Sequence, residues 1–166
     1  VVHGHVPLLS QKVVEWAKKM NKEARKVGAK GVNVVGMCCT GIEVLMRLGV
    51  PMAGHILQQE LAIVTGAVDA MVVDVQCIYP SLQDVASCYH TKIITTMDFV
   101  KIPGAIHIRF TTKNPDKAAK RIVKEAILAY KKRVRSRVFI PKEKSVIYGG
   151  FSAETILTAL SKLNKK

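Results

Sequence analysis

The chain alternates between short apolar runs and longer stretches in which apolar residues recur every three or four positions. Short unbroken runs rich in β-branched residues are typical of strands buried on both faces, and the longer spacing is typical of amphipathic helices. The runs predict strands at 32–35, 68–76, 92–96, 105–110 and 146–148, and residues 1–2 look like the end of another strand. The helical spacing predicts helices at 10–27, 40–49, 57–66, 81–90, 114–130 and 152–163.

Residues that favour helix ends support two of these helices. Ser10 is expected to cap the first helix, and Gly28 is expected to end it. Thr40 and Glu43 match a capping box, in which Thr40 accepts from a backbone amide and Glu43 reaches back; Gly49 fits the end of that helix. The two adjacent cysteines before Thr40 are therefore expected in a tight strand-to-helix turn.

Strands and helices alternate along the whole chain, and this order predicts the fold class. Such alternation favours an α/β fold with a doubly wound, mostly parallel sheet and helices on both faces. The sequence contains no internal repeat and no obvious linker, and at 166 residues it fits one domain, 1–166. It has no apolar run long enough to cross a membrane. Because it starts without Met and its first residues match the end of a strand, we expect a fragment of a longer multidomain enzyme.

The net charge of +14 is large and lies mostly between Lys113 and Lys144, with a short tail at Lys165 and Lys166. Such a charge suits either a polyanionic or acidic partner or a solvated lysine-rich face. Nucleic-acid-binding surfaces usually place aromatic residues among the basic ones. Tyr130 is the main aromatic residue of this region, and it falls on the apolar side of a predicted helix. Nucleic-acid binding is therefore disfavoured.

The four cysteines carry no secretory context and form no CxxC pair. This usage indicates a reducing, cytoplasmic compartment and argues against a disulfide framework, a zinc ribbon or a thioredoxin-like site. Cys88, on a predicted helix, is expected to have a packing role.

Metal-capable side chains follow three of the apolar runs. His5 follows the first run, Cys38 and Cys39 follow the second, and Cys77 follows the third. Because the carboxyl ends of parallel strands share one sheet edge, these residues can meet although they are far apart in sequence. Imidazole together with thiolates is a ligand set for soft metals or iron–sulfur clusters.

Other chemistries are open at the same residues. Taken singly, His5, Cys39 and Cys77 each fit a structural role in the core. A cysteine at a helix N-terminus, with His5 as its base, would also suit a nucleophile. Dinucleotide binding is disfavoured because the segment 36–41 has neither the GxGxxG nor the Walker A spacing.

Five segments, in order along the chain, resemble anaerobic nickel-containing carbon monoxide dehydrogenase. They are HGHVPLLS at 3–10, GMCCTG at 36–41, LQQEL at 57–61, VDVQC at 73–77 and GFS at 150–152. The resemblance covers essentially the whole chain and corresponds to the first of that enzyme's two Rossmann-like domains.

The resemblance implies an oxidoreductase with a nickel–4Fe–4S cluster that interconverts CO and CO2. By this similarity His5 and Cys39 would hold the iron outside the cubane, and Cys77 would bind one cubane iron; Cys38 is the less favoured neighbour. The preference for Cys39 comes from the resemblance, since spacing alone does not separate adjacent residues in a turn. No other catalytic residue of the family is expected in this chain.

The family also implies parts that this sequence lacks. Three further cluster cysteines lie in the family beyond the position of Lys166, and further 4Fe–4S clusters lie on an N-terminal helical domain. We therefore expect the isolated chain to fold but not to oxidise CO. The implied parent is homodimeric and passes electrons to a ferredoxin-like acceptor. The alternatives are a hybrid-cluster-type iron–sulfur domain and a non-catalytic basic α/β binding module.

Overall fold

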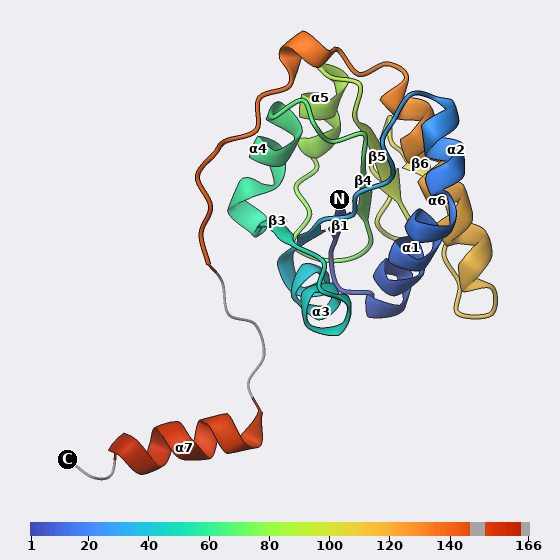
Figure 1. Cartoon of the computed structure of the whole chain (residues 1–166). Helices are drawn as coiled ribbons and strands as arrows, with labels where there is room; N and C mark the ends of the chain where they lie inside the picture. The colour runs from blue at the N-terminus through green and yellow to red at the C-terminus, as the bar shows by residue number, and fades with distance from the viewer. Residues whose placement is uncertain (147–151, 164–166) are drawn as a thin grey trace.

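A single parallel sheet forms the centre of the molecule, described by a computed structural model that covers residues 1–146 and 152–163 (Figure 1). The strand order is β3-β2-β1-β4-β5-β6, and every neighbouring pair is parallel. The strands are β1 (Val2–His3), β2 (Gly36–Met37), β3 (Met52–Gly54), β4 (Ala70–Val73), β5 (Lys92–Thr95) and β6 (Ile106–His107). This is the order of a Rossmann-like sheet, so the predicted α/β class is confirmed.

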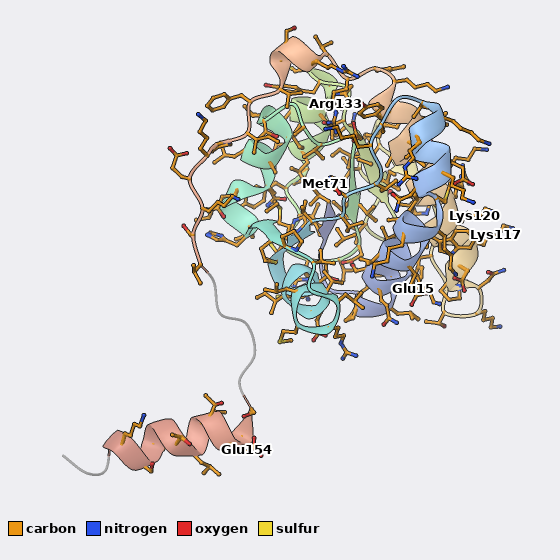
Figure 2. The ribbon with its side chains drawn as sticks, viewed as in Figure 1. Glu15, Met71, Lys117, Lys120, Arg133 and Glu154 are labelled. Carbon is orange, nitrogen blue, oxygen red and sulfur yellow. The ribbon has the colours of Figure 1, made fainter. Side chains whose placement is uncertain are left out.

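Helices cover both faces of the sheet and give it two apolar cores. The helices are α1 (Pro7–Lys19), α2 (Asn21–Lys26), α3 (Cys38–Leu48), α4 (Gln59–Val64), α5 (Leu82–Ser87), α6 (Pro115–Tyr130) and α7 (Ala153–Leu163), with 3-10 turns η1 (Ile56–Gln58) and η2 (Arg135–Arg137). Val72 and Ile94 pack on the α1–α6 side, whereas Met71 and Ile93 pack on the α4–α5 side. In Figure 2, Met71 lies in the middle of the body, whereas Lys117 and Lys120 lie at its margin.

The first helix differs from its prediction at both ends. It begins at Pro7, a residue favoured in the first turn, and it is interrupted at Met20 before α2. The Ser10 hydroxyl does not cap a helix; it is buried and accepts a hydrogen bond of 2.7 Å from the Thr40 hydroxyl. The predicted cap was wrong because a long-range partner takes this side chain. Gly28 follows α2 with a positive φ of 83°, as its predicted role requires.

The second predicted strand was placed too early. Residues 32–35 form no strand, and pairing is confined to Gly36 and Met37. Val32 and Val34 lie outside the strand but pack partly against the α1–α6 core, which accounts for the apolar run. An apolar run therefore indicates buried or partly buried residues, and in this segment the partly buried residues come before the two that pair in the sheet. β3, beyond α3, was not predicted at all.

The C-terminal helix α7 agrees with its prediction. The Ser152 hydroxyl oxygen accepts from the Thr155 amide at 3.2 Å, as an N-cap should. Its apolar residues Ile156, Leu157 and Leu160 are exposed, and Figure 1 shows α7 apart from the sheet. The predicted strand at 146–148 falls largely outside the described residues, and the assignment of 1–166 to one domain stays a prediction.

No helix within residues 1–146 and 152–163 is both long enough and apolar enough to cross a membrane.

Candidate metal centre

The three predicted ligands lie beyond the carboxyl ends of three adjacent strands. β1 pairs with β2 on one side and with β4 on the other. His5 follows β1, Cys39 follows β2 at the start of α3, and Cys77 lies in the loop after β4. The parallel topology therefore brings their loops to one edge of the sheet.

The loop that carries His5 is fastened to the end of β4 by a buried carboxylate. Asp74 is 1% exposed, and its oxygens accept from the backbone amides of His5 at 2.6 Å and Val6 at 2.9 Å. The Val75 amide donates to the same carboxylate. Gly4 makes this approach possible, because it has a φ of 127° and a Cβ there would lie 1.8 Å from the Asp74 Oδ1.

The imidazole of His5 is oriented by a second contact between the same two loops. Its Nδ1 lies 3.0 Å from the carbonyl oxygen of Val75. Because a carbonyl only accepts, Nδ1 carries a proton, and in the neutral ring Nε2 then keeps its lone pair. A histidine that ligates a metal usually has this arrangement, in which a carbonyl fixes the tautomer.

The paired cysteines occupy the first turn of α3, and they differ in exposure. Cys38 is 7% exposed and has a left-handed φ of 56°, whereas Cys39 is exposed. Burial, with smaller contributions from the thiols of Cys77 and Cys39, raises the pKa of Cys38 to about 11. Cys38 is therefore poorly suited to act as a thiolate, while Cys39 is open to a ligand.

The predicted capping box at Thr40 is wrong. α3 begins at Cys38, two residues earlier, and no side chain caps it. The Thr40 amide donates to the Gly4 carbonyl at 2.8 Å, and its hydroxyl donates to Ser10. Thr40 thus ties the start of α3 to the loop that carries His5.

Two glycines let α3 start directly at the end of β2. A Cβ on Gly36 would lie 2.4 Å from the Gly41 Cα, so any side chain there would push the helix away from the strand. The glycines of this segment therefore serve close packing of strand and helix.

The loop after β4 presents Cys77 in an unusual backbone conformation. Gln76 and Cys77 have φ values of 57° and 51°, in the left-handed region that side-chain-bearing residues seldom adopt. The Cys77 carbonyl accepts from His3 Nε2 at 2.9 Å and from Gln59 Nε2 at 3.2 Å. Cys77 itself is half-buried.

Three buried polar residues that support this edge were missed as functional residues: His3, Gln59 and Asp74. Burial lowers the pKa of His3, and hydrogen bonds to Gln59 and the Cys77 carbonyl offset part of this effect. One signal was available in the sequence: Asp74 is a charged residue inside an apolar run, and such a residue needs dedicated partners. The partners of His3 and Gln59 are too distant in sequence to infer.

The arrangement does not form a site for a single metal ion. Within residues 1–146 and 152–163, no three His, Cys, Asp or Glu side chains lie close enough together to hold one. A mononuclear zinc site is therefore not supported by the described residues. Ligands to different metals of one larger cluster need no such closeness, and the donor set of imidazole and thiols suits iron and nickel.

A profile of the Prismane/CO dehydrogenase family matches residues 1–159. The chain is 58% identical over 164 residues to carbon monoxide dehydrogenase 1 of Carboxydothermus hydrogenoformans, covering 98% of this chain and 26% of that protein.

Solved structures give the same result. Carbon monoxide dehydrogenase IV of Carboxydothermus hydrogenoformans matches with a TM-score of 0.89 and 61% identity, over 99% of this chain and 26% of that one. An acetyl-CoA synthase/carbon monoxide dehydrogenase, described with NiZn[Fe4S4] and NiNi[Fe4S4] clusters in its alpha subunits, matches with a TM-score of 0.88 and 51% identity, over 99% of this chain and 25% of that one. The chain spans about a quarter of these relatives. It belongs to the Prismane/CO dehydrogenase family.

Proposed function

We propose that this chain is one domain of an anaerobic nickel-containing carbon monoxide dehydrogenase, and that it supplies ligands to the active-site cluster. The observation that carries the proposal is the carboxyl edge of the sheet. There His5, with Nε2 free and Nδ1 committed to a carbonyl, lies on a loop fastened to the loop of Cys77. Membership of the family supports the assignment.

The three ligands have separate roles in this proposal. His5 and Cys39 hold the iron outside the cubane, and Cys77 binds a cubane iron. Cys38 is the less favoured ligand because it is buried, whereas Cys39 is exposed. The remaining ligands come from other parts of the parent protein, as do further 4Fe–4S clusters.

When bound, a nickel–iron–sulfur cluster would supply the redox and Lewis-acid chemistry for CO + H2O → CO2 + 2 electrons + 2 protons. The residues of this chain hold the ligand side chains and fix their orientation. Val75 fixes the ring of His5 through its carbonyl, and Asp74 fixes the backbone of the same loop. The protein groups that accept the two protons lie outside this chain in our proposal.

The exposed basic side chains of α6 suit an acidic electron acceptor. Lys117, Lys120, Arg121 and Lys124 are all exposed, and no ion pair is formed by them within the described residues. A ferredoxin-like protein with an acidic surface would complement this helix. We place the parent enzyme in the cytoplasm as a homodimer.

The full-length protein, purified without oxygen, tests the ligand assignment. His5→Ala, Cys39→Ala and Cys77→Ala should each lower the bound nickel and iron and reduce CO-dependent viologen reduction by about 100-fold or more. Cys88→Ala is the matched control, because Cys88 is an exposed thiol on a different element. Normal metal content and turnover in Cys77→Ala would contradict the assignment.

The isolated 166-residue chain provides a complementary test. Loaded with iron, sulfide and nickel, it should not reduce a viologen dye with CO, because it holds only part of one cluster's ligands. Turnover by this chain would show that the set of three is sufficient and would overturn the proposed dependence on the rest of the parent.

A further inference from the structure

The backbone at Cys77 needs an external support. Two consecutive residues, Gln76 and Cys77, adopt left-handed φ values, and neither is a glycine. Such a conformation persists only where surrounding contacts impose it. The question is which contacts impose it, and whether they also fix the direction of the thiol.

Two fully buried side chains converge on the carbonyl oxygen of Cys77. His3 is 1% exposed and Gln59 is 0% exposed. The Nε2 atoms of His3 and Gln59 lie 2.9 and 3.2 Å from that oxygen. Since the oxygen only accepts, His3 carries its proton on Nε2.

The orientation of Gln59 is fixed by its other partners. Its Nε2 also donates to the Ile56 carbonyl at 2.8 Å, while its Oε1 accepts from the Tyr79 amide at 3.2 Å. Oε1 also lies 3.2 Å from His3 Nε2. Gln59 therefore holds the loop at Cys77 and again at Tyr79, two residues further on.

His3 carries a cost that packing alone does not explain. No group among the described residues meets its buried Nδ1 in hydrogen-bond geometry, although the backbone of Met37 contributes to the pKa of His3. A buried polar atom without a partner is unfavourable, so an apolar residue would be the better choice for a purely structural position. What an apolar residue cannot offer is the Nε2–H that reaches the Cys77 carbonyl.

We infer that His3 and Gln59 are positioning residues that hold Cys77 in its ligand conformation before any metal binds. His3, at the end of β1, and His5, on the loop that follows, contact the carbonyls of Cys77 and Val75 in the loop after β4. The two histidines thus set the spacing between the ligands His5 and Cys77. This inference rests on the proposed function for the identity of the ligands, but the support of the loop is measurable without metal.

Hydrogen exchange of the 166-residue chain without metal tests the support directly. In His3→Leu, exchange at residues 76–79 should be about tenfold faster than in the wild type, because a hydrogen bond that restrains the loop is lost. His3→Gln should stay near the wild type, since its amide nitrogen can take the place of Nε2. His3→Asn, which is polar but shorter, should resemble His3→Leu.

The control is Thr91→Val, directly before β5, whose hydroxyl bonds to the segment that leads into the amino end of β4. The Thr91 hydroxyl donates to the Val68 carbonyl at 2.6 Å, and the residue is 7% exposed. This variant also loses a bond from a side chain to a backbone carbonyl, but it should leave exchange at 76–79 unchanged. If His3→Leu does not fold, the comparison of His3→Gln with His3→Asn decides alone.

Iron content of the full-length protein, purified without oxygen, gives the second measurement. His3→Asn should retain several-fold less iron than His3→Gln. Equal exchange at 76–79 in His3→Gln and His3→Asn would overturn the inference. Full iron content in Cys77→Ala would instead contradict the ligand assignment and would leave the exchange result standing, so the two failures are distinguishable.

Discussion

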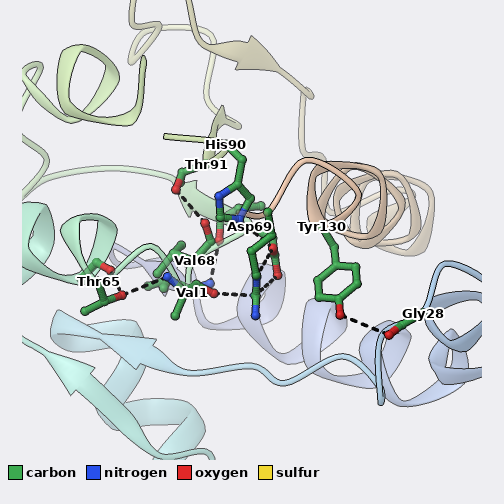
Figure 3. A network of polar contacts seen from close by, with 12 residues as sticks. Val1, Gly28, Thr65, Val68, Asp69, His90, Thr91 and Tyr130 are labelled. Atoms are coloured by element: carbon green, nitrogen blue, oxygen red, sulfur yellow. Dashed lines mark hydrogen bonds and ion pairs between the residues drawn. The ribbon is translucent and has the colours of Figure 1, made fainter. Parts of the chain in front are cut away.

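The two ends of β4 each hold an aspartate, but they satisfy it in different ways. At the amino end, Asp69 is bound by side chains: Arg133 Nη2 lies 2.6 Å and His90 Nε2 lies 2.9 Å from its oxygens (Figure 3). At the carboxyl end, Asp74 is bound by three backbone amides and is 1% exposed.

The two ends therefore differ in whether their side chains remain available to bind a ligand. At the amino end the polar side chains bond to one another, so their hydrogen-bonding groups are already paired within the fold. The carboxyl end fastens its loops through the backbone, which leaves the side chains of His5, Cys39 and Cys77 available. An edge built to bind something should have this second form, because ligands that are already paired must be released first.

Removing Asp74 should give the largest effect. Asp74→Ala leaves three buried amide donors without their acceptor and should lower the free energy of unfolding by about 4 kcal/mol. Urea denaturation measures this change. Asp84→Ala, at an exposed carboxylate on α5, is the control and should cost about 0.5 kcal/mol. Equal losses of stability in both variants would show that the three amide bonds to Asp74 do not stabilise the carboxyl end.

Gly4 should come next, because its missing side chain is what admits Asp74. Gly4→Ala puts a Cβ into the carboxylate and should cost about 3 kcal/mol. Gly28→Ala is the matched control: its φ of 83° is also positive, but nothing lies within 4 Å of a Cβ there. It should cost about 1 kcal/mol. Thermal unfolding of both variants checks the difference, and similar melting temperatures would refute it.

The amino end should respond more weakly and only locally. Asp69→Asn weakens a partly exposed ion pair with Arg133 and should cost about 1 to 2 kcal/mol. Hydrogen exchange at residues 75–79 should stay at the wild-type rate. Faster exchange there would mean that the two ends of the strand are coupled, and the comparison would fail.

A titration provides the smallest effect and a probe that belongs to neither end. Trp16, the only tryptophan, donates through Nε1 to Asp116 Oδ1 at 2.9 Å. This bond, followed by the charge of Lys12, lowers the pKa of Asp116 in the folded protein. Because the folded pKa is the lower one, the stabilisation is present above the usual aspartate pKa of about 3.9 and is lost as the pH falls through the folded value.

The measurement is urea denaturation followed by Trp16 emission at pH 6 and at pH 3. Asp116→Asn should lose less stability over this interval than the wild type does. If both lose the same amount, the carboxylate of Asp116 does not contribute. At pH 6 the wild type and Asp116→Asn should show the same hydrogen exchange at residues 75–79.

Apart from β3, the order of the described strands and helices was predictable from the sequence because it depends on local apolar spacing. The helix predicted at 114–130 is α6 (Pro115–Tyr130), and Asn114 caps it by accepting from the Lys117 amide at 3.3 Å. Ser10 and Thr40 were assigned to caps and instead bond to each other across 30 positions. Local patterns do not contain such partners.

The candidate site was predictable only as a set of ligand types on one edge. The pattern did not choose between Cys38 and Cys39, because their difference in burial depends on how α3 packs against β2. The roles of His3 and Gln59 depend on a carbonyl 74 and 18 positions away, respectively. Hydrogen bonds to a distant backbone atom leave no trace in spacing or composition.

The left-handed backbone at Cys38, Gln76 and Cys77 has a consequence for protein engineering. Glycine adopts this conformation without the penalty that other residues incur, so a screen for thermal stability would favour glycine at these positions by about 1 kcal/mol each. Such a screen would discard the Cys77 thiol and count the loss as an improvement. A stabilised version of this domain should therefore be selected with residues 38, 76 and 77 held fixed, and with metal content as a second criterion.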